Sequence, residues 1–218
     1  MKIIELTFKI RVPDWLESIL VQPVLFYRRI RYGYPYRRIP LTQGKYAIVD
    51  PEDFERLSKH KWHLQRTNQT FYAVRRAKGR ERTKGQVVFM HRSIMSPPEG
   101  MSIDHINNNG LDNRKANLRL ATAAQNARNR RKMALKTSSK YKGVSYHAGQ
   151  RKWCASIRVN GQYKYFGLFQ NEIDAARAYD KAAKKYHKDF AALNFPSRCH
   201  PDRSDAQHHE VEGSGQRM

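Results

Sequence analysis

The chain has 218 residues, of which 39% are hydrophobic. This low fraction disfavours one large core and favours small modules joined by basic linkers. Lysine and arginine total 42 against 19 acidic residues, which gives a net charge of +23 and a pI near 10.3. This excess predicts a polyanionic partner, with nucleic acid as the first candidate and an anionic membrane as the second. Having only 2 cysteines excludes a disulfide framework and a four-cysteine zinc site.

Residues 1–42 are predicted to form a basic, aromatic N-terminal arm. The opening MKIIELTFKIRVPDW lacks the plan of a signal peptide. The apolar stretch WLESILVQPVLFY contains Glu17 and Pro23 and is too short to span a bilayer. We expect it to pack against the body of the protein rather than at a membrane interface. The following YRRIRYGYPYRRIPL is compatible with an extended arm or a solvated connection. We expect a cytoplasmic, nucleoid-associated protein with no membrane partner.

The next segment, residues 43–133, predicts a small module that we call the first module. In GKYAIVDPEDFERLSKHKWHL, a strand is expected over 46–49, followed by a helix that begins near Asp50 with Pro51 in its first turn. TFYAVRRA and QVVFMHR are strand-like runs on either side of the polar turn KGRERTKG. His91 in the second run has two interpretations, a structural histidine or a contact to a nearby site.

Residues 102–132, SIDHINNNGLDNRKANLRLATAAQNARNRRK, carry the residue types that metal-assisted phosphodiester cleavage needs. That reaction requires a base for the attacking water and positive charge at the phosphate and the leaving oxygen. Asp104 is a hard oxygen ligand suited to Mg²⁺, and His105 is predicted to be the general base. Asn117 lies where the chain should return as a strand, so its amide is expected to tie down the loop and hold the histidine ring. Asn126, on the following helix, is expected to complete the metal site.

The next turn of that helix is predicted to meet DNA phosphates through Asn129, Arg130 and Arg131. The alternative for the whole stretch is a solvated, asparagine-rich turn, because Asn and Asp favour turns and helix caps. We favour the nuclease site because four positions fit together in a chain of net charge +23.

The first module resembles the HNH endonucleases of the phage and homing type through GKYAIVDPEDFERLSKHKWH, MHRSIM and DHINNNGLDNRKANLRLATAAQNARNRR. The resemblance implies a ββα-metal fold around one divalent ion. It implies that Asp104 is a metal ligand, His105 the general base, Asn117 the structural middle residue and Asn126 the second ligand. This helix has no final histidine, which favours an oxygen-ligand site for Mg²⁺, with Mn²⁺ as an alternative, over a zinc site.

After a linker over residues 134–140, the pattern changes to a hairpin followed by a helix. WCASIRV-NG-QYKYFGLF has a two-residue Asn-Gly loop between runs of period two, the strongest short signal of a hairpin. The pairs that this loop predicts are Val159–Gln162, Arg158–Tyr163, Ser156–Tyr165 and Cys154–Gly167. NEIDAARAYDKAAKKYH is expected to be a helix capped by Asn171. Alternation places Trp153, Ala155, Ile157, Val159 and Phe166 on one face of the sheet. The helix should cover that face with an apolar stripe of Ile173, Ala176, Tyr179, Ala183 and Tyr186.

The opposite face of this sheet is predicted to bind DNA. Strand alternation places several polar and aromatic side chains there, namely Ser156, Arg158, Tyr163 and Tyr165, with Lys142 and His147 expected from the preceding strand. A basic and aromatic sheet face suits the DNA major groove, which admits a β-ribbon or sheet. The alternative is an ordinary solvated sheet face.

Residues 141–196, which we call the second module, resemble an AP2/ERF DNA-binding domain. The segments YKGV, KWCASI, FGLF, AARAYDKAA and LNFP occur in that order. The resemblance implies a three-stranded antiparallel sheet packed on one helix, which reads DNA with the face away from the helix. Ser145 and His147 stand where plant members often carry arginine, so the target sequence cannot be carried over.

The predicted fold class is therefore α+β, with a small ββα-metal HNH module and a separate AP2-like module. The polar tail over residues 197–218 is predicted to be disordered. We predict a metal-dependent endonuclease that nicks or cuts double-stranded DNA, is targeted by the AP2-like module, and is of the homing or phage-associated kind. The alternative is a sequence-specific DNA-binding regulator with a degenerate HNH module.

Overall fold

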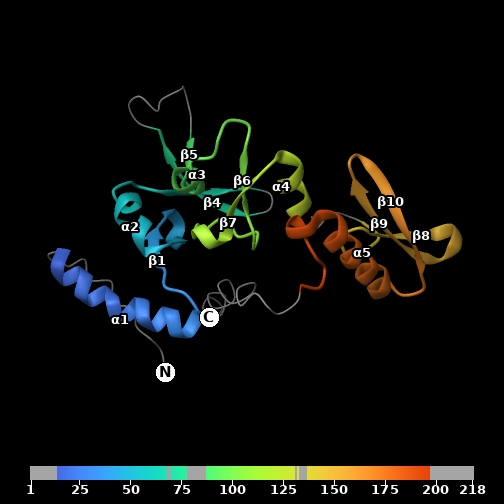
Figure 1. Ribbon diagram of the computed structural model, residues 1–218, viewed down its shortest axis with the longest axis horizontal. Coiled ribbons are helices and arrows are strands. Elements are labelled where there is room, and N and C mark those ends of the chain that lie inside the picture. The colour runs from blue at the N-terminus through green and yellow to red at the C-terminus, as the bar shows by residue number, and fades with distance from the viewer. Residues whose placement is uncertain (1–13, 68–69, 78–86, 131, 133–136, 197–218) are drawn as a thin grey trace, which may run out of the picture.

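The structure, a computed structural model, describes residues 14–67, 70–77, 87–130, 132 and 137–196 (Figure 1). Its helices are α1 (Asp14–Tyr32), α2 (Pro51–Ser58), α3 (Met90–Met95), α4 (Ala123–Asn129) and α5 (Glu172–His187). Its strands are β1 (Arg37–Pro40), β2 (Tyr46–Val49), β3 (His63–Arg66), β4 (Phe71–Arg76), β5 (Val87–Phe89), β6 (Ser102–His105), β7 (Leu118–Ala121), β8 (Val144–His147), β9 (Lys152–Val159) and β10 (Gln162–Phe169). Within these residues the strands form small antiparallel sheets, ordered β1-β2, β3-β4-β5, β6-β7 and β10-β9-β8. The predicted α+β class is confirmed.

The first core lies where β1, β2, α2, β4 and α3 meet. The predicted strand over 46–49 is present as β2, and Pro51 occupies the first turn of α2, where its missing N–H costs no hydrogen bond. The Trp62 indole donates a 2.8 Å hydrogen bond to the carbonyl of Leu57 at the end of α2. The buried members of this core are Ile39, Ala47, Val49, Leu57, Trp62, Ala73 and Met90. Each large apolar side chain that is fully buried contributes roughly 1.5–3 kcal/mol.

Part of the segment that was expected to form an N-terminal arm, strand β1, belongs to this core. β1 pairs with β2 along its whole length, and Ile39 is 2% exposed. The described part of residues 1–42 is therefore a helix and a strand rather than an extended arm.

Helix α1 is tethered to the strand that follows it but leaves apolar side chains in solvent. The Arg28 guanidinium donates a 2.6 Å hydrogen bond to the carbonyl of Tyr36 and lies 4.3 Å from the Tyr36 ring. Phe26 and Ile30 are nevertheless 67% and 70% exposed, so the expected packing of this stretch is only partial. None of the described helices is long and apolar enough to cross a membrane.

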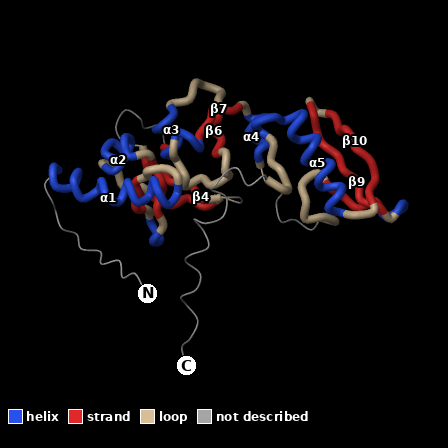
Figure 2. The backbone as a smooth tube through the Cα atoms, turned by 60° about the horizontal axis from the view of Figure 1, so that its bottom comes forward, coloured by secondary structure: helices blue, strands red, loops and turns tan. Residues whose placement is uncertain are grey.

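In the second module, α5 crosses one face of the β8–β9–β10 sheet (Figure 2). Ala155 and Ile157 of β9 lie in the cores formed with α5, where Tyr179 and Ala183 are also buried. The predicted helix-facing side of the sheet is thus confirmed. Ile173, the first residue of the predicted stripe, is 39% exposed and lies outside these cores.

The hairpin register is confirmed from Val159–Gln162 through Ser156–Tyr165. Its last predicted pair is wrong, because Cys154 pairs with Leu168 and not with Gly167. A bulge follows Tyr165, and Gly167 has a φ of +114°, a conformation that favours glycine.

The two modules lie side by side, with α4 of the first against the short 3₁₀ turn η5 (Lys188–Phe190) of the second (Figures 1 and 2). The tail over 197–218, which is predicted to be disordered, lies outside the described residues.

Candidate active site

β6, β7 and α4 follow one another as a ββα unit (Figure 1). β6 ends with Asp104 and His105, and β7 returns antiparallel with Arg119 opposite Asp104. A capping box starts α4: the Thr122 side chain accepts from the Gln125 N–H, and the Gln125 side chain accepts from the Thr122 N–H. Asp104 and His105 are 4% and 5% exposed, which does not fit a solvated turn.

Asn117 ties down the loop between β6 and β7, as expected. Its Nδ2 donates to the Asp112 carbonyl at 2.8 Å and to Asn107 Oδ1 at 3.0 Å, and its Oδ1 accepts from the Asn107 N–H at 3.0 Å. The histidine ring, however, is held by another residue. His105 Nε2 lies 3.3 Å from Asn113 Oδ1, so the expectation that Asn117 holds the ring is wrong.

Asn113 lies in the loop between β6 and β7 and is placed by a backbone contact with β2. Its backbone N–H donates a 2.8 Å hydrogen bond to the carbonyl of Ile48 in β2, and its side chain is buried at 1% exposure. In this orientation the Asn113 carbonyl oxygen accepts from His105 Nε2–H, and the lone pair of His105 lies on Nδ1.

The carboxylate of Asp104 is fixed by two partners that the spacing of the residues did not predict, Arg119 and Asn129. Arg119 donates to Oδ2 through Nε at 2.8 Å and Nη2 at 2.6 Å. Asn129 Nδ2 lies 2.9 Å from Oδ1, 3.0 Å from Oδ2 and 3.0 Å from the His105 carbonyl. The expected phosphate contact of Asn129 is therefore wrong, because this residue is 2% exposed. Asn129 lies three residues after Asn126 and therefore on the same helix face, and this spacing could have predicted that Asn129 belongs to the site.

Asn126 remains available as a ligand. It is half-buried on α4, and its side chain makes no hydrogen bond to any residue that the structure describes. Among the described residues, Asp104 Oδ1 accepts one N–H, from Asn129, which leaves it a lone pair. A carboxylate and an amide oxygen form the donor set that Mg²⁺ prefers, with phosphate and water oxygens to complete its six ligands. The residues present therefore fit a divalent hard cation.

Aromatic rings surround the His105 imidazole. The His91 ring meets it edge-on at a centroid distance of 5.1 Å, and the Tyr72 ring lies 5.8 Å away. Burial lowers the pKa of His105 below its ordinary value, and the hydrogen bond to Asn113 offsets only part of this shift. Burial and the nearby His105 lower the pKa of His91 to about 3. Both rings are thus neutral near pH 7, and His91 is at once buried and in contact with the site.

His91→Phe is expected to make the protein less sensitive to acid. Because the folded pKa of His91 lies near 3 and the unfolded value near 6.5, only the unfolded chain takes up this proton between those pH values. Stability is therefore lost as pH falls through this window, by roughly 2 kcal/mol from pH 6.5 to 4.5, because the slope reaches about 1.4 kcal/mol per pH unit only once the unfolded histidine is mostly protonated. Urea unfolding at several pH values measures the slope. His63→Phe, which replaces an exposed histidine, is the control. If the unfolding free energy of His91→Phe falls with pH as steeply as that of this control, the assignment is wrong.

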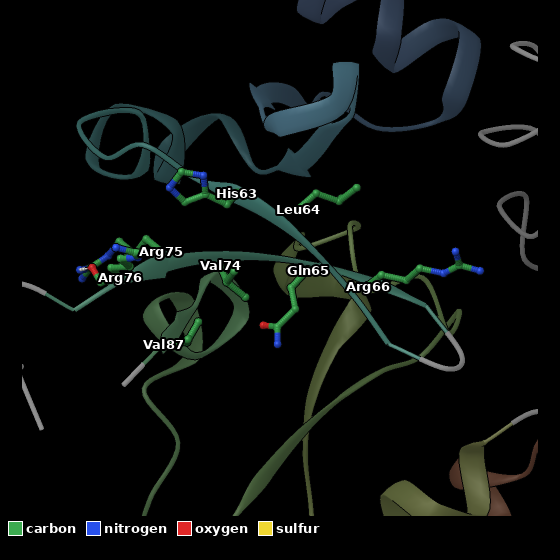
Figure 3. Close-up of a pocket in the computed structure, with 8 residues that line it drawn as sticks. All are labelled: His63, Leu64, Gln65, Arg66, Val74, Arg75, Arg76 and Val87. Atoms are coloured by element: carbon green, nitrogen blue, oxygen red, sulfur yellow. Dashed lines mark hydrogen bonds between the residues drawn. The ribbon is translucent and has the colours of Figure 1, made fainter. Parts of the chain in front are cut away.

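A pocket of about 640 Å³ lies on the β3–β4–β5 sheet that flanks the site, with arginine side chains at its edges (Figure 3). Its lining residues are His63, Leu64, Gln65, Arg66, Val74, Arg75, Arg76 and Val87. Tyr72, which contacts the His105 ring, belongs to β4 of the same sheet. Arg130 is exposed at the end of α4, and Arg131 lies outside the described residues.

The second module presents the predicted polar face. Tyr163 and Tyr165 are 63% and 73% exposed on the side away from α5. Arg158 is exposed, with its guanidinium 5.8 Å from the Tyr163 ring, and Ser156 is half-buried. Strand alternation places the exposed His147 on the same face.

Lys142 is not on this face, so its expected placement is wrong. Its Nζ donates hydrogen bonds of 2.6 Å to the carbonyls of Arg128 and Arg130 at the end of α4. Burial lowers the pKa of Lys142 to about 8. The strand begins only after Gly143, which has a φ of +72° and no room for a Cβ, since that atom would meet the Tyr179 ring. The side chain of Lys142 therefore does not follow the alternation of β8.

Part of the chain is similar to plant proteins. It is 43% identical over 60 residues to APETALA2-like protein 2 of Oryza sativa subsp. indica. It is 42% identical over 67 residues to an ethylene-responsive transcription factor of Arabidopsis thaliana. These matches span 27% and 30% of this chain but only 14% and 16% of the plant proteins. They support the resemblance to an AP2/ERF-type domain.

A larger part of the chain is similar to a viral nuclease. Residues 96–128 match the HNH endonuclease family, and they include Asp104, His105, Asn117 and Asn126. Over 158 residues the chain is 31% identical to an uncharacterized HNH endonuclease of Acanthamoeba polyphaga mimivirus. That alignment covers 70% of this chain and 76% of the viral protein. The chain therefore belongs to the HNH endonuclease family.

Proposed function

We propose that this protein is a metal-dependent endonuclease that hydrolyses phosphodiester bonds in double-stranded DNA. The observation that carries the proposal is the buried pair at the end of β6, where a neutral His105 ring lies next to the fixed carboxylate of Asp104. A neutral imidazole accepts a proton, and a fixed carboxylate oxygen binds a hard cation. Membership in the HNH endonuclease family supports the same reaction class.

Each residue of the site has a separate task in this proposal. His105 takes the proton of the attacking water at Nδ1, while Asn113 holds its Nε2 and Asn117 holds the loop. Asp104 and Asn126 hold the divalent ion, Mg²⁺ or Mn²⁺. When bound, that ion neutralises charge on the phosphate and stabilises the leaving oxygen.

The second module is proposed to choose where the nuclease acts. Arg158, Tyr163 and Tyr165 stand on an exposed sheet face suited to the major groove, and Ser156 lies between them. Arg130 and the exposed arginines beside the pocket, Arg66 and Arg76, are proposed to hold phosphates without regard to sequence. The homing, mobile-element or phage association and the location beside the nucleoid belong to the same proposal.

One contact favours a second candidate, a sequence-specific DNA-binding regulator with an inactive HNH module. The guanidinium of Arg119 already neutralises the charge of Asp104 without a metal ion. In this alternative the ion pair only stabilises the fold, and the second module carries the function.

Cleavage of a random-sequence duplex library, with and without Mg²⁺ and followed by sequencing of the ends, tests the proposal. We expect the parent chain to cut a restricted set of sites only with the metal. Arg158→Ala should still cut but choose sites less strictly, because a base-reading arginine contributes about 1–3 kcal/mol of discrimination. Arg130→Ala should instead weaken binding to all sequences and reduce the salt dependence by about one unit of slope.

Two results would refute parts of this proposal. Absence of cutting by the parent with Mg²⁺ would support the regulator. Unchanged site preference in Arg158→Ala would show that this arginine does not read the target.

A further inference from the structure

Arg119 contacts both modules with one guanidinium group. Its Nε and Nη2 hold Asp104 Oδ2, while its Nη1 donates a 2.6 Å hydrogen bond to the carbonyl of Asp189 in η5. The guanidinium also lies 3.8 Å from the centroid of the Phe190 ring, a cation–π distance. One face of this side chain is therefore held by the second module, and its edge holds the carboxylate of the first.

The turn that presents these partners has an unusual backbone. Lys188, directly after α5, has a φ of +49°, which is uncommon for a residue other than glycine. This turn ends α5 and starts η5, the segment that carries Asp189 and Phe190 to Arg119. Surrounding contacts must hold such a conformation in place.

A second contact joins the modules at α4, the helix that carries Asn126. Lys142 of the second module donates to the carbonyls of Arg128 and Arg130, the free acceptors at the end of this helix. Lys132 donates a 2.8 Å hydrogen bond in the other direction, to the carbonyl of Tyr141. The second module thus contacts two elements of the candidate site, β7 through Arg119 and α4 through Lys142.

We propose that Arg119 is a positioning residue through which the docked second module holds the carboxylate of Asp104 in its metal-binding orientation. The inference rests on the proposed nuclease function. A guanidinium that donates two hydrogen bonds to one carboxylate fixes the direction of that carboxylate only while it is itself held. Phe190 and the Asp189 carbonyl supply that constraint. Residues that orient a metal ligand in this way typically change metal affinity or activity by 10–100-fold when they are lost.

Mn²⁺ affinity in a DNA complex of the full chain tests the inference without relying on cleavage. All variants carry His105→Ala to prevent cutting, and electron paramagnetic resonance measures bound Mn²⁺. The same chain with Asp104→Asn reports binding elsewhere, including at the acidic group of Asp50, Glu52 and Asp53. Phe190→Ala and Arg119→Lys should weaken Mn²⁺ binding by about 10–100-fold while fluorescence anisotropy shows unchanged affinity for DNA.

Matched variants separate the loss of the Phe190–Arg119 contact from general damage to the second module. Phe190→Tyr keeps the ring under the guanidinium and should bind Mn²⁺ like the reference chain. Ile173→Ala, at the far end of α5 from η5, should do the same. If Phe190→Ala lowers the melting temperature of the module, Phe190→Leu, which keeps apolar volume without the ring, repeats the test.

Two outcomes would overturn the inference, and they are distinguishable. If Phe190→Ala and Phe190→Leu bind Mn²⁺ as tightly as the reference chain, the second module does not position Asp104, although the metal site stands. If Asp104→Asn itself leaves Mn²⁺ binding unchanged, the metal site of the proposed function is wrong and the coupling fails with it.

Discussion

Replacing His105 with alanine is expected to lower the cleavage rate by roughly 10²–10⁴-fold, the usual contribution of a general base. The ring is 5% exposed and contacts Asn113, His91 and Tyr72, so its loss removes a proton acceptor rather than a surface contact to DNA. DNA affinity should therefore be retained.

Single-turnover cleavage of a plasmid with Mg²⁺ measures the rate, and fluorescence anisotropy measures the affinity. His60→Ala, at an exposed position, is the matched control and should cut like the parent. If His105→Ala cuts as fast as this control, the catalytic base lies elsewhere.

Asp104→Asn should abolish Mg²⁺-supported cleavage and destabilise the first module. The substitution keeps the shape of the side chain but removes the charge that pairs with Arg119 and that is proposed to bind the cation. Asp104 is 4% exposed and the Arg119 side chain 17%, so the variant leaves a largely buried guanidinium without its counter-charge. Breaking a buried pair from one side typically costs roughly 3–5 kcal/mol of unfolding free energy.

A second variant separates the two effects of Asp104→Asn. Adding Arg119→Met removes the uncompensated charge, and replacement of a buried ion pair by apolar groups is often neutral or stabilising. Urea unfolding should therefore show a recovery of stability, whereas plasmid cleavage should stay absent. Cleavage by Asp104→Asn at the parent rate, or by the parent in excess EDTA, would rule out the assigned metal ligand.

The second module was the more predictable of the two. An Asn-Gly loop of two residues fixes which positions pair, and Asn160 and Gly161 indeed have φ values of +49° and +85°. Alternation then assigned Ala155 and Ile157 to the helix side and Tyr163 and Tyr165 to the exposed side, as observed. The prediction failed where a bulge at Gly167 shifted the ladder, because a bulge depends on local twist and packing rather than on alternation.

In the first module, spacing along the chain predicted the strands and the helix of the site but not the hydrogen-bond partner of each side chain. The order of β6, β7 and α4 and the burial of the Asp104–His105 pair agree with the prediction of a built site. Asn113 holds the ring in place of Asn117, and Asn129, which was expected at a phosphate, holds the carboxylate of Asp104. An asparagine-rich stretch offers many chemically equal amides, so only their positions in the fold decide which is used.

By itself, then, the sequence determined the resemblance to two families, the hairpin register near its turn and the adjacency of Asp104 and His105, since each depends on residues that lie close together in the chain. Only the tertiary structure decided that Lys142 caps α4 and that Arg119 joins Asp104 to Asp189 and Phe190. The physical reason is distance along the chain. Arg119 donates to a carbonyl 70 residues away, and no local periodicity or propensity specifies which distant backbone group will meet a buried guanidinium.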